Sequence, residues 1–464
     1  MSGPLRVAIV GAGASGTLLA IHLLRQRAAP VAISLIERSG VFGRGVAYGA
    51  TNPDHTLNVP AHLMGGVDQD DADGFVRWSA PAAAGDELAR LRLAYPARGA
   101  YGDYLQHLLH RARADSAAAN RCDLLAAEAV RVEPIASQAG APAFRVQFAD
   151  APALEADRVV LCLGNLPPPR LGAQDAARVI EDPWLPGAFD VACAAARVVI
   201  VGTGLSMVDA VLDLERAGFS GTIVALSRHG CLPVADAPVV PYPDFLAPGL
   251  AHLGIREVTR ALRAEIRTAA ARGIGWHSVI EAFRVHAGAI WIDLDERNRR
   301  RFLRHLRSPW LVVRHRLPPR HMRTLQAMIG AGRLQVRAAR VLGVEDAASG
   351  CTVRILPRGA IRAETLATDV LINCTGPQSD FRRVRMPLLA SLIETGQVRP
   401  DAYGLGLAVS DDLAAIGADG TPSDGLFVVG SHTRGRFWEV TAVPHIRRQV
   451  EDLTRHLVGR SGYC

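Results

Sequence analysis

The chain of 464 residues is long enough for two or three packed domains, and its 49% hydrophobic and 21% charged residues exclude a disordered protein. No apolar run reaches the length of a membrane span, and the N-terminus leads into a strand without a secretory signal, so we expect a cytoplasmic protein with no membrane partner. The net charge of +7 comes from arginine, because lysine is absent as in many GC-rich genomes; this excludes a lysine Schiff base and indicates no nucleic-acid partner.

The first glycine motif is VAIVGAGASG at 7–16, directly after an apolar strand. Its glycines are Gly11, Gly13 and Gly16. We predict a helix over 17–26 and a second strand over 31–36, which together form a βαβ unit. Glu37 closes that strand, where an acid accepts hydrogen bonds from an adenosine ribose while the pyrophosphate lies on the helix N-terminus. Strand, glycines, helix and acid together predict a dinucleotide site.

A loop rich in glycine and turn residues follows at 42–66. It is too long and too polar for an ordinary connection, so we interpret it as a functional loop. The segment 95–105 predicts the start of another helix, and strands return near 129–132, 144–148 and 158–163. The last of these strands ends in CLGN and is followed by three prolines, which predict a hinge.

A second strand and glycine turn, RVVIVGTGLSMVDA, opens a βαβ unit over 197–228. It contains Gly202 and Gly204, but Met207 occupies the third glycine position. Its second strand ends in Ser227-Arg228, with no acid. Arginine and serine bind a 2′-phosphate that an acid would repel, so this site favours NADPH over NADH. Arg228 as plain surface charge remains the alternative.

The segment 245–331 has mostly helical periodicity, and we predict a helical insertion that covers a cleft. Its three tryptophans are expected in the core, and the arginine-rich stretch 297–316 is first interpreted as a solvated helix face. Strands resume after 334, and the segment 370–380 (VLINCTGPQSD) repeats the strand-to-loop pattern of CLGN. The segment 425–449 predicts a strand, a glycine turn and a helix.

We therefore predict an α/β fold with two Rossmann-like dinucleotide-binding domains and a helical insertion. The expected ranges are 1–190 for the first part of one domain, 191–335 for the second domain with the insertion at about 245–330, and 336–464 for the return to the first domain. The seven cysteines have neither CxxC nor zinc-type spacing, so we predict no metal site. A disulfide-reducing flavoenzyme is not expected, because no cysteine pair follows the first glycine motif.

These pieces resemble the two-dinucleotide-binding flavoprotein family, whose members have two strand-to-loop segments ending in ATG-like sequences. Cys162-Leu163-Gly164 and Cys374-Thr375-Gly376 correspond to these segments. The runs GRGVAYGATNPDHTLNVPA, YPARGAYGDYL and TRGRFWEVTAVPHIRRQ are similar to a bacterial FAD/NAD(P)-binding subgroup that includes the Xanthomonas-type FAD-dependent urate hydroxylase. The resemblance covers nearly the whole chain. This chain departs from the subgroup at Ser431-His432, where Gly-Pro is usual, and at His445, where Glu is usual.

The resemblance implies FAD at the first glycine motif and NADH or NADPH at the second. The cofactor-binding residues that we assign are Gly11, Gly13, Ser15, Gly16, Glu37, Arg44, Asn58, Arg98, Val130, Gly164, Gly202, Gly204, Ser206, Ser227, Arg228, Thr375, Gly376, Gly430, Glu439 and Thr441. Residues 439–441 are expected to open a helix whose N–H groups face the flavin. Arg98 has an alternative role as a helix cap.

The catalytic candidates are Asn58 and His432. Asn58 is expected to hydrogen-bond the flavin edge or the nicotinamide, or else to shape the turn before Pro60. His432 is the preferred acid/base group, because it lies in the flavin-proximal motif. Replacing His432 with alanine should then depress product formation more than NAD(P)H binding. The other histidines near the pocket by motif position are His55, His62 and His445.

The resemblance also implies the reaction: NAD(P)H reduces the flavin, O₂ adds at its C4a, and the resulting hydroperoxide oxygenates a small electron-rich substrate. The preferred substrate, urate hydroxylated to 5-hydroxyisourate, rests on the resemblance alone. The alternatives are N-hydroxylation of an amine or amino acid, an NAD(P)H-dependent flavin reductase or oxidase, and a flavin-binding redox sensor. The expected partners are a small-molecule substrate and O₂, and homo-oligomerisation is left open.

Overall fold

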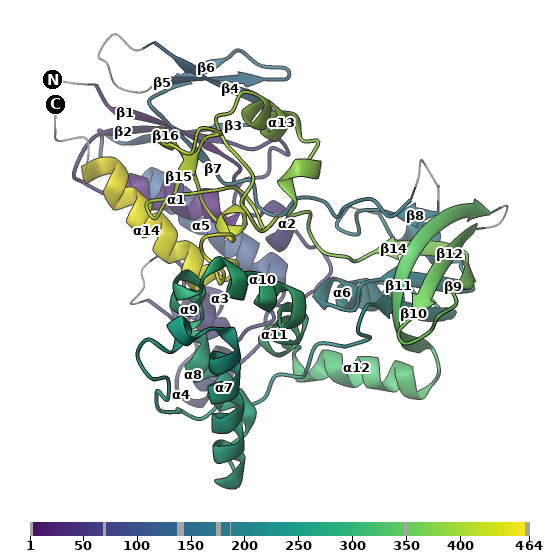
Figure 1. Cartoon of the computed structure of the whole chain (residues 1–464). Helices are drawn as coiled ribbons and strands as arrows, with labels where there is room; N and C mark the ends of the chain where they lie inside the picture. The colour runs from purple at the N-terminus through teal and green to yellow at the C-terminus, as the bar shows by residue number, and fades with distance from the viewer. Residues whose placement is uncertain are drawn as a thin grey trace. The chain divides into compact units, whose positions relative to one another are not determined.

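The computed structural model describes residues 3–67, 71–136, 143–172, 178–185, 187–347 and 350–459, and the chain forms two compact units (Figure 1). The first unit comprises residues 1–53, 59–166 and 379–464. The second unit comprises residues 54–58 and 167–378. The N-terminal segment therefore contributes to both units, because five residues of its long loop belong with the second one.

The first unit is built on a six-stranded sheet in the order β15-β16-β7-β1-β2-β3. Its strands are β1 Leu5–Val10, β2 Val31–Ile36, β3 Arg121–Leu125, β7 Arg158–Leu161, β15 Ala414–Ile416 and β16 Pro422–Val428. All neighbours pair in parallel except β15 with β16. The central strands are continuous apolar runs, as expected for a parallel sheet that is covered on both faces.

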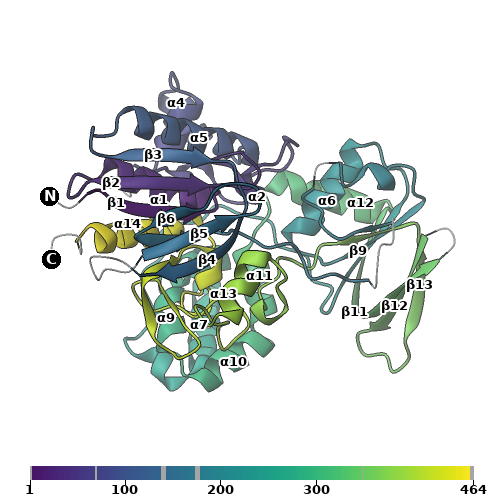
Figure 2. The same ribbon diagram turned by 90° about the horizontal axis from the view of Figure 1, so that it is seen from above.

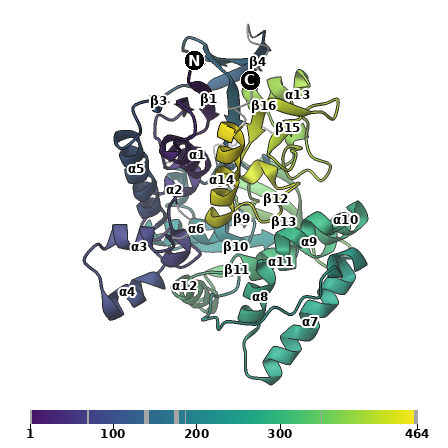
Figure 3. The same ribbon diagram turned by 90° about the vertical axis from the view of Figure 1, so that its left-hand side faces the viewer.

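Three helices, α1 Ala14–Arg25, α5 Arg98–Ala114 and α14 Val443–Gly459, pack together beside this sheet, with α1 in contact with both of the others (Figure 3). The shorter helices of the unit are α2 Gly45–Tyr48, α3 Gly74–Ser79, α4 Gly85–Arg92 and α13 Pro387–Glu394. α14 begins at Val443, so residues 439–441 lie in the turn before it, which corrects the prediction that they open the helix.

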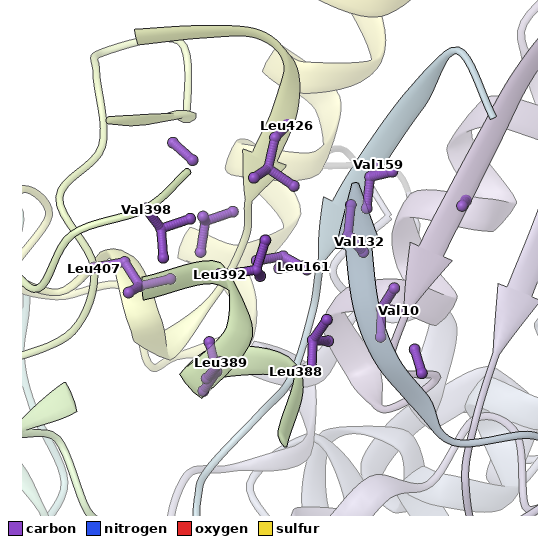
Figure 4. Close-up of a cluster of buried hydrophobic side chains, with 14 of the residues drawn as sticks. Val10, Val132, Val159, Leu161, Leu388, Leu389, Leu392, Val398, Leu407 and Leu426 are labelled. Carbon is purple, nitrogen blue, oxygen red and sulfur yellow. The ribbon is translucent and has the colours of Figure 1, made fainter. Parts of the chain in front are cut away.

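A small antiparallel sheet packs on the six-stranded sheet. Its strands are β4 Ala129–Ile135, β5 Ala143–Phe148 and β6 Leu154–Ala156. The core between the two sheets and α13 contains Val132, Leu161 and Leu388, all at most 1% exposed (Figure 4). Burying each such side chain contributes about 1.5–3 kcal/mol. This core fixes β7 and β16, whose carboxyl ends carry site residues.

The second unit is built on a seven-stranded sheet in the order β13-β12-β11-β10-β9-β14-β8 (Figure 2). Its strands are β8 Val179–Ile180, β9 Arg197–Val201, β10 Thr222–Ser227, β11 Leu334–Ala347, β12 Gly350–Pro357, β13 Glu364–Thr368 and β14 Val370–Asn373. Helices α6 Leu205–Arg216 and α12 Pro319–Gly330 contribute buried residues to its core. Both predicted βαβ units are therefore present, and the α/β prediction is confirmed.

The unit boundaries differ from the expected domain ranges. β14 pairs in parallel with β9, so residues 336–378 belong to the second unit and not to the return of the first. β8 pairs with β14, so residues 167–190 also belong to the second unit. The physical reason is long-range strand pairing, which joins segments that local sequence patterns leave unconnected.

The predicted helical insertion follows β10. Its helices are α7 Ile255–Ala271, α8 Trp276–Arg284, α9 Ala287–Asp293, α10 Glu296–His305 and α11 Arg307–Arg314. Trp291 and Trp310 are buried, as expected of core residues, whereas Trp276 is half-buried and stacks on His277. In the described residues, no helix combines the length and apolarity needed to cross a membrane.

Candidate functional site

The first glycine turn joins β1 to α1 in a conformation that requires glycine. Gly11 has a φ of 101°, and a Cβ atom there would overlap the carbonyl oxygen of Cys162. A Cβ on Gly16 would overlap the carbonyl oxygen of Gly11, so α1 lies directly against the turn. The free N–H groups of the first helical turn, at Ala14 and Ser15, therefore lie at the end of β1. Such a helix N-terminus binds a pyrophosphate.

Hydrogen bonds to the carboxylate of Glu37 hold this side chain beside the turn. Oε2 accepts a hydrogen bond from the Ala12 backbone N–H at 3.0 Å. Oε1 accepts from the backbone N–H and the hydroxyl of Ser39, at 3.1 and 2.9 Å. An ionised carboxylate has about four acceptor positions, so one remains for a ribose hydroxyl. The acid thus lies beside the first glycine turn, and its role towards a ribose remains a prediction.

The start of the long loop lies against the same turn. The Gly43 N–H donates to the Ala12 carbonyl at 2.8 Å, and a Cβ on Gly45 would lie 2.9 Å from the Gly13 Cα. Arg44 is held by an ion pair with Asp103 and by a hydrogen bond from its Nε to Gln106 at 3.2 Å. Arg98 is the first residue of α5, the helix that carries these two partners. Arg44 and the first turn are therefore brought together by α5.

The carboxyl ends of β7 and β16 meet next to α1. Gly164 and Gly430 both have positive φ, at 66° and 89°. The Ser431 hydroxyl donates to the Gly164 carbonyl at 2.9 Å, and a Cβ on Gly430 would lie 2.7 Å from the Ser15 hydroxyl. Nothing lies within 4 Å of a Cβ placed on Gly164, so this edge is open. Ligands of such sheets bind at the carboxyl ends of parallel strands.

Val130 occupies a β-bulge. The β4–β5 register shifts between Ala129 and Arg131, so Val130 is the extra residue on its strand. A bulged residue is left outside the regular hydrogen-bond ladder. Its role towards a cofactor remains a prediction.

His432 lies in a short 3₁₀ turn, Ser431–Thr433, and is 4% exposed. Its ring packs edge-on against Phe381 at 4.8 Å between centroids, and the Gly164 backbone next to it partly opposes the effect of burial on its pKa. Burial lowers the pKa of His432 to about 4. The imidazole is therefore neutral at pH 7, and it offers a hydrogen-bond donor and an acceptor but no imidazolium proton.

Three further predicted residues lie outside this cluster or are placed differently from expectation. Glu439 is buried and Thr441 exposed, both in the turn before α14. Asn58 ends the segment 54–58, which is anchored on α6 by ion pairs of Asp54 with Arg216 at 3.5 Å and of His55 with Asp213 at 3.0 Å. The role of Asn58 towards a cofactor remains a prediction.

The second glycine turn joins β9 to α6 and is more open than the first. Gly202 has a φ of 120°, and a Cβ there would overlap the Cys374 carbonyl oxygen, as at the first turn. Gly204 has nothing within 4 Å of a Cβ, and Met207 is fully buried in the core of the second unit. Ser206 is half-buried in the first turn of α6.

Arg228 follows β10 on the surface and has a cationic neighbour. Burial lowers the pKa of the Arg307 guanidinium, and the positive charge of Arg228 lowers it further. Within the residues that the structure describes, neither arginine forms an ion pair with a carboxylate. Ser227 accepts a hydrogen bond from the Gly230 N–H at 3.0 Å. Arg228, which follows β10, and Arg307, which begins α11, make a candidate phosphate site.

Sequence reasoning missed Arg307, because it belongs to the helical insertion and no local motif marks it. The second ATG-like segment is held by Asn373, whose Oδ1 accepts from the Thr375 N–H and hydroxyl at 3.2 and 2.7 Å. Gly376 follows with a φ of 90°. These residues lie at the end of β14, next to the second glycine turn, through the pairing of β14 with β9.

Of the described cysteines, Cys122, Cys162, Cys351 and Cys374 are buried, and Cys193 and Cys231 are exposed. Cys464 lies outside the described residues. Burial raises the pKa of the Cys162 thiol well above its usual value, so it is a poor nucleophile. Among the described residues, no group of His, Cys, Asp and Glu has the arrangement of a metal site.

Comparison with known proteins supports the nucleotide-binding assignment. Residues 8–166 match the model of a family described as FAD-NAD(P)-binding. An uncharacterized protein of Mycobacterium tuberculosis is 24% identical over an aligned length of 342 residues, and the match covers 66% of this chain. The chain spans 62% of the length of that relative.

Solved structures resemble the chain over nearly its whole length. The ornithine N-hydroxylase of Kutzneria sp. 744, described with reduced FAD, NADP⁺ and L-ornithine, has a TM-score of 0.67 at 17% identity and covers 99% of this chain and 100% of its own. The L-lysine 6-monooxygenase of Pseudomonas syringae has a TM-score of 0.64 at 16% identity, covering 98% and 99%. The bacillithiol disulfide reductase of Staphylococcus aureus has a TM-score of 0.57 at 12% identity, covering 99% of each chain.

At these identities the likeness shows the fold. The chain has the dinucleotide-binding fold of these enzymes, and its residues 8–166 are similar to a family described as FAD-NAD(P)-binding.

Proposed function

We propose that the chain is an NADPH- and O₂-dependent flavin monooxygenase that N-hydroxylates a small amine or amino acid. The observation that carries this proposal is the likeness to ornithine and lysine monooxygenases over 98–100% of both chains. It favours the alternative raised by the sequence over urate hydroxylation, for which the comparisons give no support. The reaction consumes one amine, O₂, NADPH and a proton, and yields a hydroxylamine, water and NADP⁺.

The first unit fits FAD. The N-terminus of α1 offers free N–H groups to the pyrophosphate, Glu37 accepts from the ribose, and the bulge at Val130 leaves backbone groups for the adenine. The open edge beside Gly164 is the feature that a bound ring would complete. Bound FAD supplies the two-electron chemistry with O₂, which the side chains of this protein lack.

The second unit fits NADPH better than NADH. Gly202 allows the close backbone approach that a pyrophosphate needs, and Arg228 with Arg307 provides two guanidinium groups for a 2′-phosphate. A free 2′-hydroxyl offers these cations no charge to neutralise. The arginines therefore select the phosphorylated donor.

His432 has a restricted role in this proposal. Its neutral imidazole donates or accepts one hydrogen bond at a fixed position, and it carries no proton as an imidazolium at neutral pH. We therefore assign His432 to holding a group by hydrogen bonding, which modifies the acid/base role expected from the sequence.

The proposal is tested with FAD-loaded protein by following NADPH oxidation, O₂ uptake, hydroxylamine and H₂O₂ with ornithine, lysine, cadaverine and urate in turn. We expect one of the amines to stimulate oxidation and to yield hydroxylamine in near-equal amount. Urate consumption coupled to NADPH oxidation would restore the original expectation. Oxidation that yields only H₂O₂ with every compound would place the chain among the reductases or oxidases and contradict the proposal.

A further inference from the structure

The helical insertion contains an open groove that the nucleotide sites do not use. It has a volume of about 650 Å³ and is lined from α7 and α10, which pack against each other (Figure 3). Five arginines and one histidine line the groove, and only Ile255, Thr259 and Leu306 complete its lining. The proposed monooxygenase activity does not explain why five of the nine residues that line this groove are arginines.

Four of the five arginines form a row along α7, and the fifth comes from α10. Every arginine of α7 lines the groove, at positions 256, 260, 263 and 267, a spacing that places them along one face of the helix. The row runs from residue 256 to residue 267 and is therefore about 16 Å long at a rise of about 1.5 Å per residue. α10 contributes Arg301 and His305, one turn apart. The positive charge is thus extended along the groove and not confined to one point.

Few carboxylates neutralise the arginines of α7. Among the described residues, Arg260 pairs with Glu257, whereas Arg256, Arg263 and Arg267 form no ion pair. The other acid of α7, Glu265, accepts a hydrogen bond from Tyr242. The pairing leaves the α7 row with most of its charge uncompensated.

The wall formed by α10 is similar. Asp295 caps α10, and its pKa is lowered by the hydrogen bond from the Asn298 backbone and, more weakly, by Arg297 and Arg301. Its carboxylate is therefore shared among several donors. Like charges at helical spacing, and facing one another across a groove, repel. An anion bound in the groove would reduce the repulsion between these arginines.

We propose that this groove binds a small polyanion carrying several phosphate groups. The guanidinium fork matches phosphate oxygens in pairs, and arginine is weakly hydrated for a cation. The volume falls within the range of about 300–1,000 Å³ that is usual for small-molecule sites. A row about 16 Å long exceeds what a single phosphate occupies.

The lining disfavours two macromolecular ligands. No aromatic side chain lines the groove, whereas proteins that bind single-stranded nucleic acid stack bases on aromatic rings. Ile255 and Leu306 are its only large apolar residues, whereas an amphipathic helix needs a row of apolar anchors. The phosphate-rich small molecule is therefore the ligand class that the lining favours.

The test titrates tripolyphosphate and ATP separately into FAD-loaded protein by calorimetry, with the Tm measured in parallel. We expect saturable binding at one site that raises Tm and weakens as salt rises. Equal affinity for both compounds identifies the phosphates as the recognised group, and tighter ATP binding adds a contribution from its organic part. Both results support the proposal.

Matched variants locate the site. Arg263→Gln/Arg301→Gln should lower the affinity at least tenfold, whereas Arg304→Gln should leave it unchanged, because Arg304 is exposed on α10 outside the groove. Arg263→Lys/Arg301→Lys keeps the charge but loses the fork, and it should bind with intermediate affinity. This variant serves if the glutamine variant fails to retain its flavin spectrum. Unchanged affinity in the folded double variants would overturn the proposal.

Three further results would overturn it. Orthophosphate that binds as tightly as tripolyphosphate would indicate an adventitious ion only. A 20-nucleotide RNA that binds more tightly through the same arginines would indicate a nucleic-acid surface. Displacement of tripolyphosphate by NADP⁺ would assign the groove to the nicotinamide site. The readout is binding, so failure of the monooxygenase proposal would leave this result unaffected.

Discussion

The two glycine turns begin with the same backbone geometry and then diverge. In both, the first glycine has a positive φ and lies against the carbonyl of a neighbouring strand end, Cys162 for Gly11 and Cys374 for Gly202. At the third position, Gly16 allows α1 to touch the turn, whereas Met207 fills the core beneath α6.

The two turns also differ in the charge of the side chains beside them. At the first turn, Glu37 is held by the backbone and suits a ribose with free hydroxyls. At the second, Ser227 and Arg228 end the strand and Arg307 adds a second cation. A glycine pattern thus predicts a turn that binds a nucleotide, and the residues at the third glycine position and at the strand end indicate which nucleotide the turn suits.

The largest effect is expected where the two turns differ most in space. Gly16→Ala should lower the free energy of unfolding by about 3 kcal/mol or more, because the new Cβ overlaps the Gly11 carbonyl although alanine is the better helix former. Gly204→Ala should cost less than about 1 kcal/mol, because its Cβ meets open space at a helix N-cap. Urea unfolding of both variants measures this difference, and equal costs would refute it.

The second effect is the pH dependence of stability that His432 of the first unit produces. His432 has a folded-state pKa of about 4 against 6.5, so above pH 6.5 it is neutral in both states and does not alter stability. Below pH 6.5 only the unfolded chain takes up the proton, so stability falls by up to about 3 kcal/mol towards pH 4. In His432→Gln, that part of the loss should disappear.

The measurement is the free energy of unfolding at pH 7, 5.5 and 4.5, with the exposed His252→Gln as control. The wild type and the control should show the same decline, and His432→Gln a shallower one. Parallel curves for all three proteins would mean that His432 is not buried as a neutral group. Activity should show no ionisation of His432 between pH 6 and 8, because it is neutral throughout that range.

A third effect tests the second turn. Arg228→Ala or Arg307→Ala should raise KM for NADPH roughly ten- to hundredfold, because each removes a charged hydrogen-bond donor worth about 1.5–3 kcal/mol. KM for NADH should change little. The exposed Arg323→Ala on α12 is the matched control for lost charge. A parallel rise for both nucleotides would show that the arginines do not recognise the 2′-phosphate.

The smallest effect concerns Glu37. Glu37→Gln leaves one carbonyl oxygen where two carboxylate oxygens served the Ala12 and Ser39 donors, and should weaken FAD binding by about 1 kcal/mol, roughly fivefold. Fluorescence titration of apoprotein with FAD measures it. NADPH affinity should be unaffected, and a loss there instead would reverse the assignment of the two turns.

Local patterns predicted much of the fold. The second strand of the first unit was expected over 31–36 and is observed over those residues, because a strand that is buried on both faces is a short, nearly continuous apolar run. The helical insertion and the two strand-to-loop segments were likewise visible. The boundaries failed where strands pair over long distances, as β14 does with β9.

The site was predicted in part for the same reason. Glycines and Glu37 belong to a local motif, and their geometry follows from it. The approach of Gly430 to Ser15, the pairing of Arg44 with Asp103 and the proximity of Arg307 to Arg228 all join distant segments. The burial that keeps His432 neutral also depends on packing that no local pattern records.

Anaerobic mixing of the FAD-loaded protein with NADPH or NADH is the most direct test of the proposal that the first turn binds FAD and the second binds NADPH. We expect that the protein retains FAD and that NADPH bleaches the flavin faster than NADH at low concentration. The variant Arg228→Ala/Arg307→Ala should lose this preference while keeping its FAD. Failure to bind FAD, equal reduction by both nucleotides, or loss of FAD from the arginine variant would contradict it.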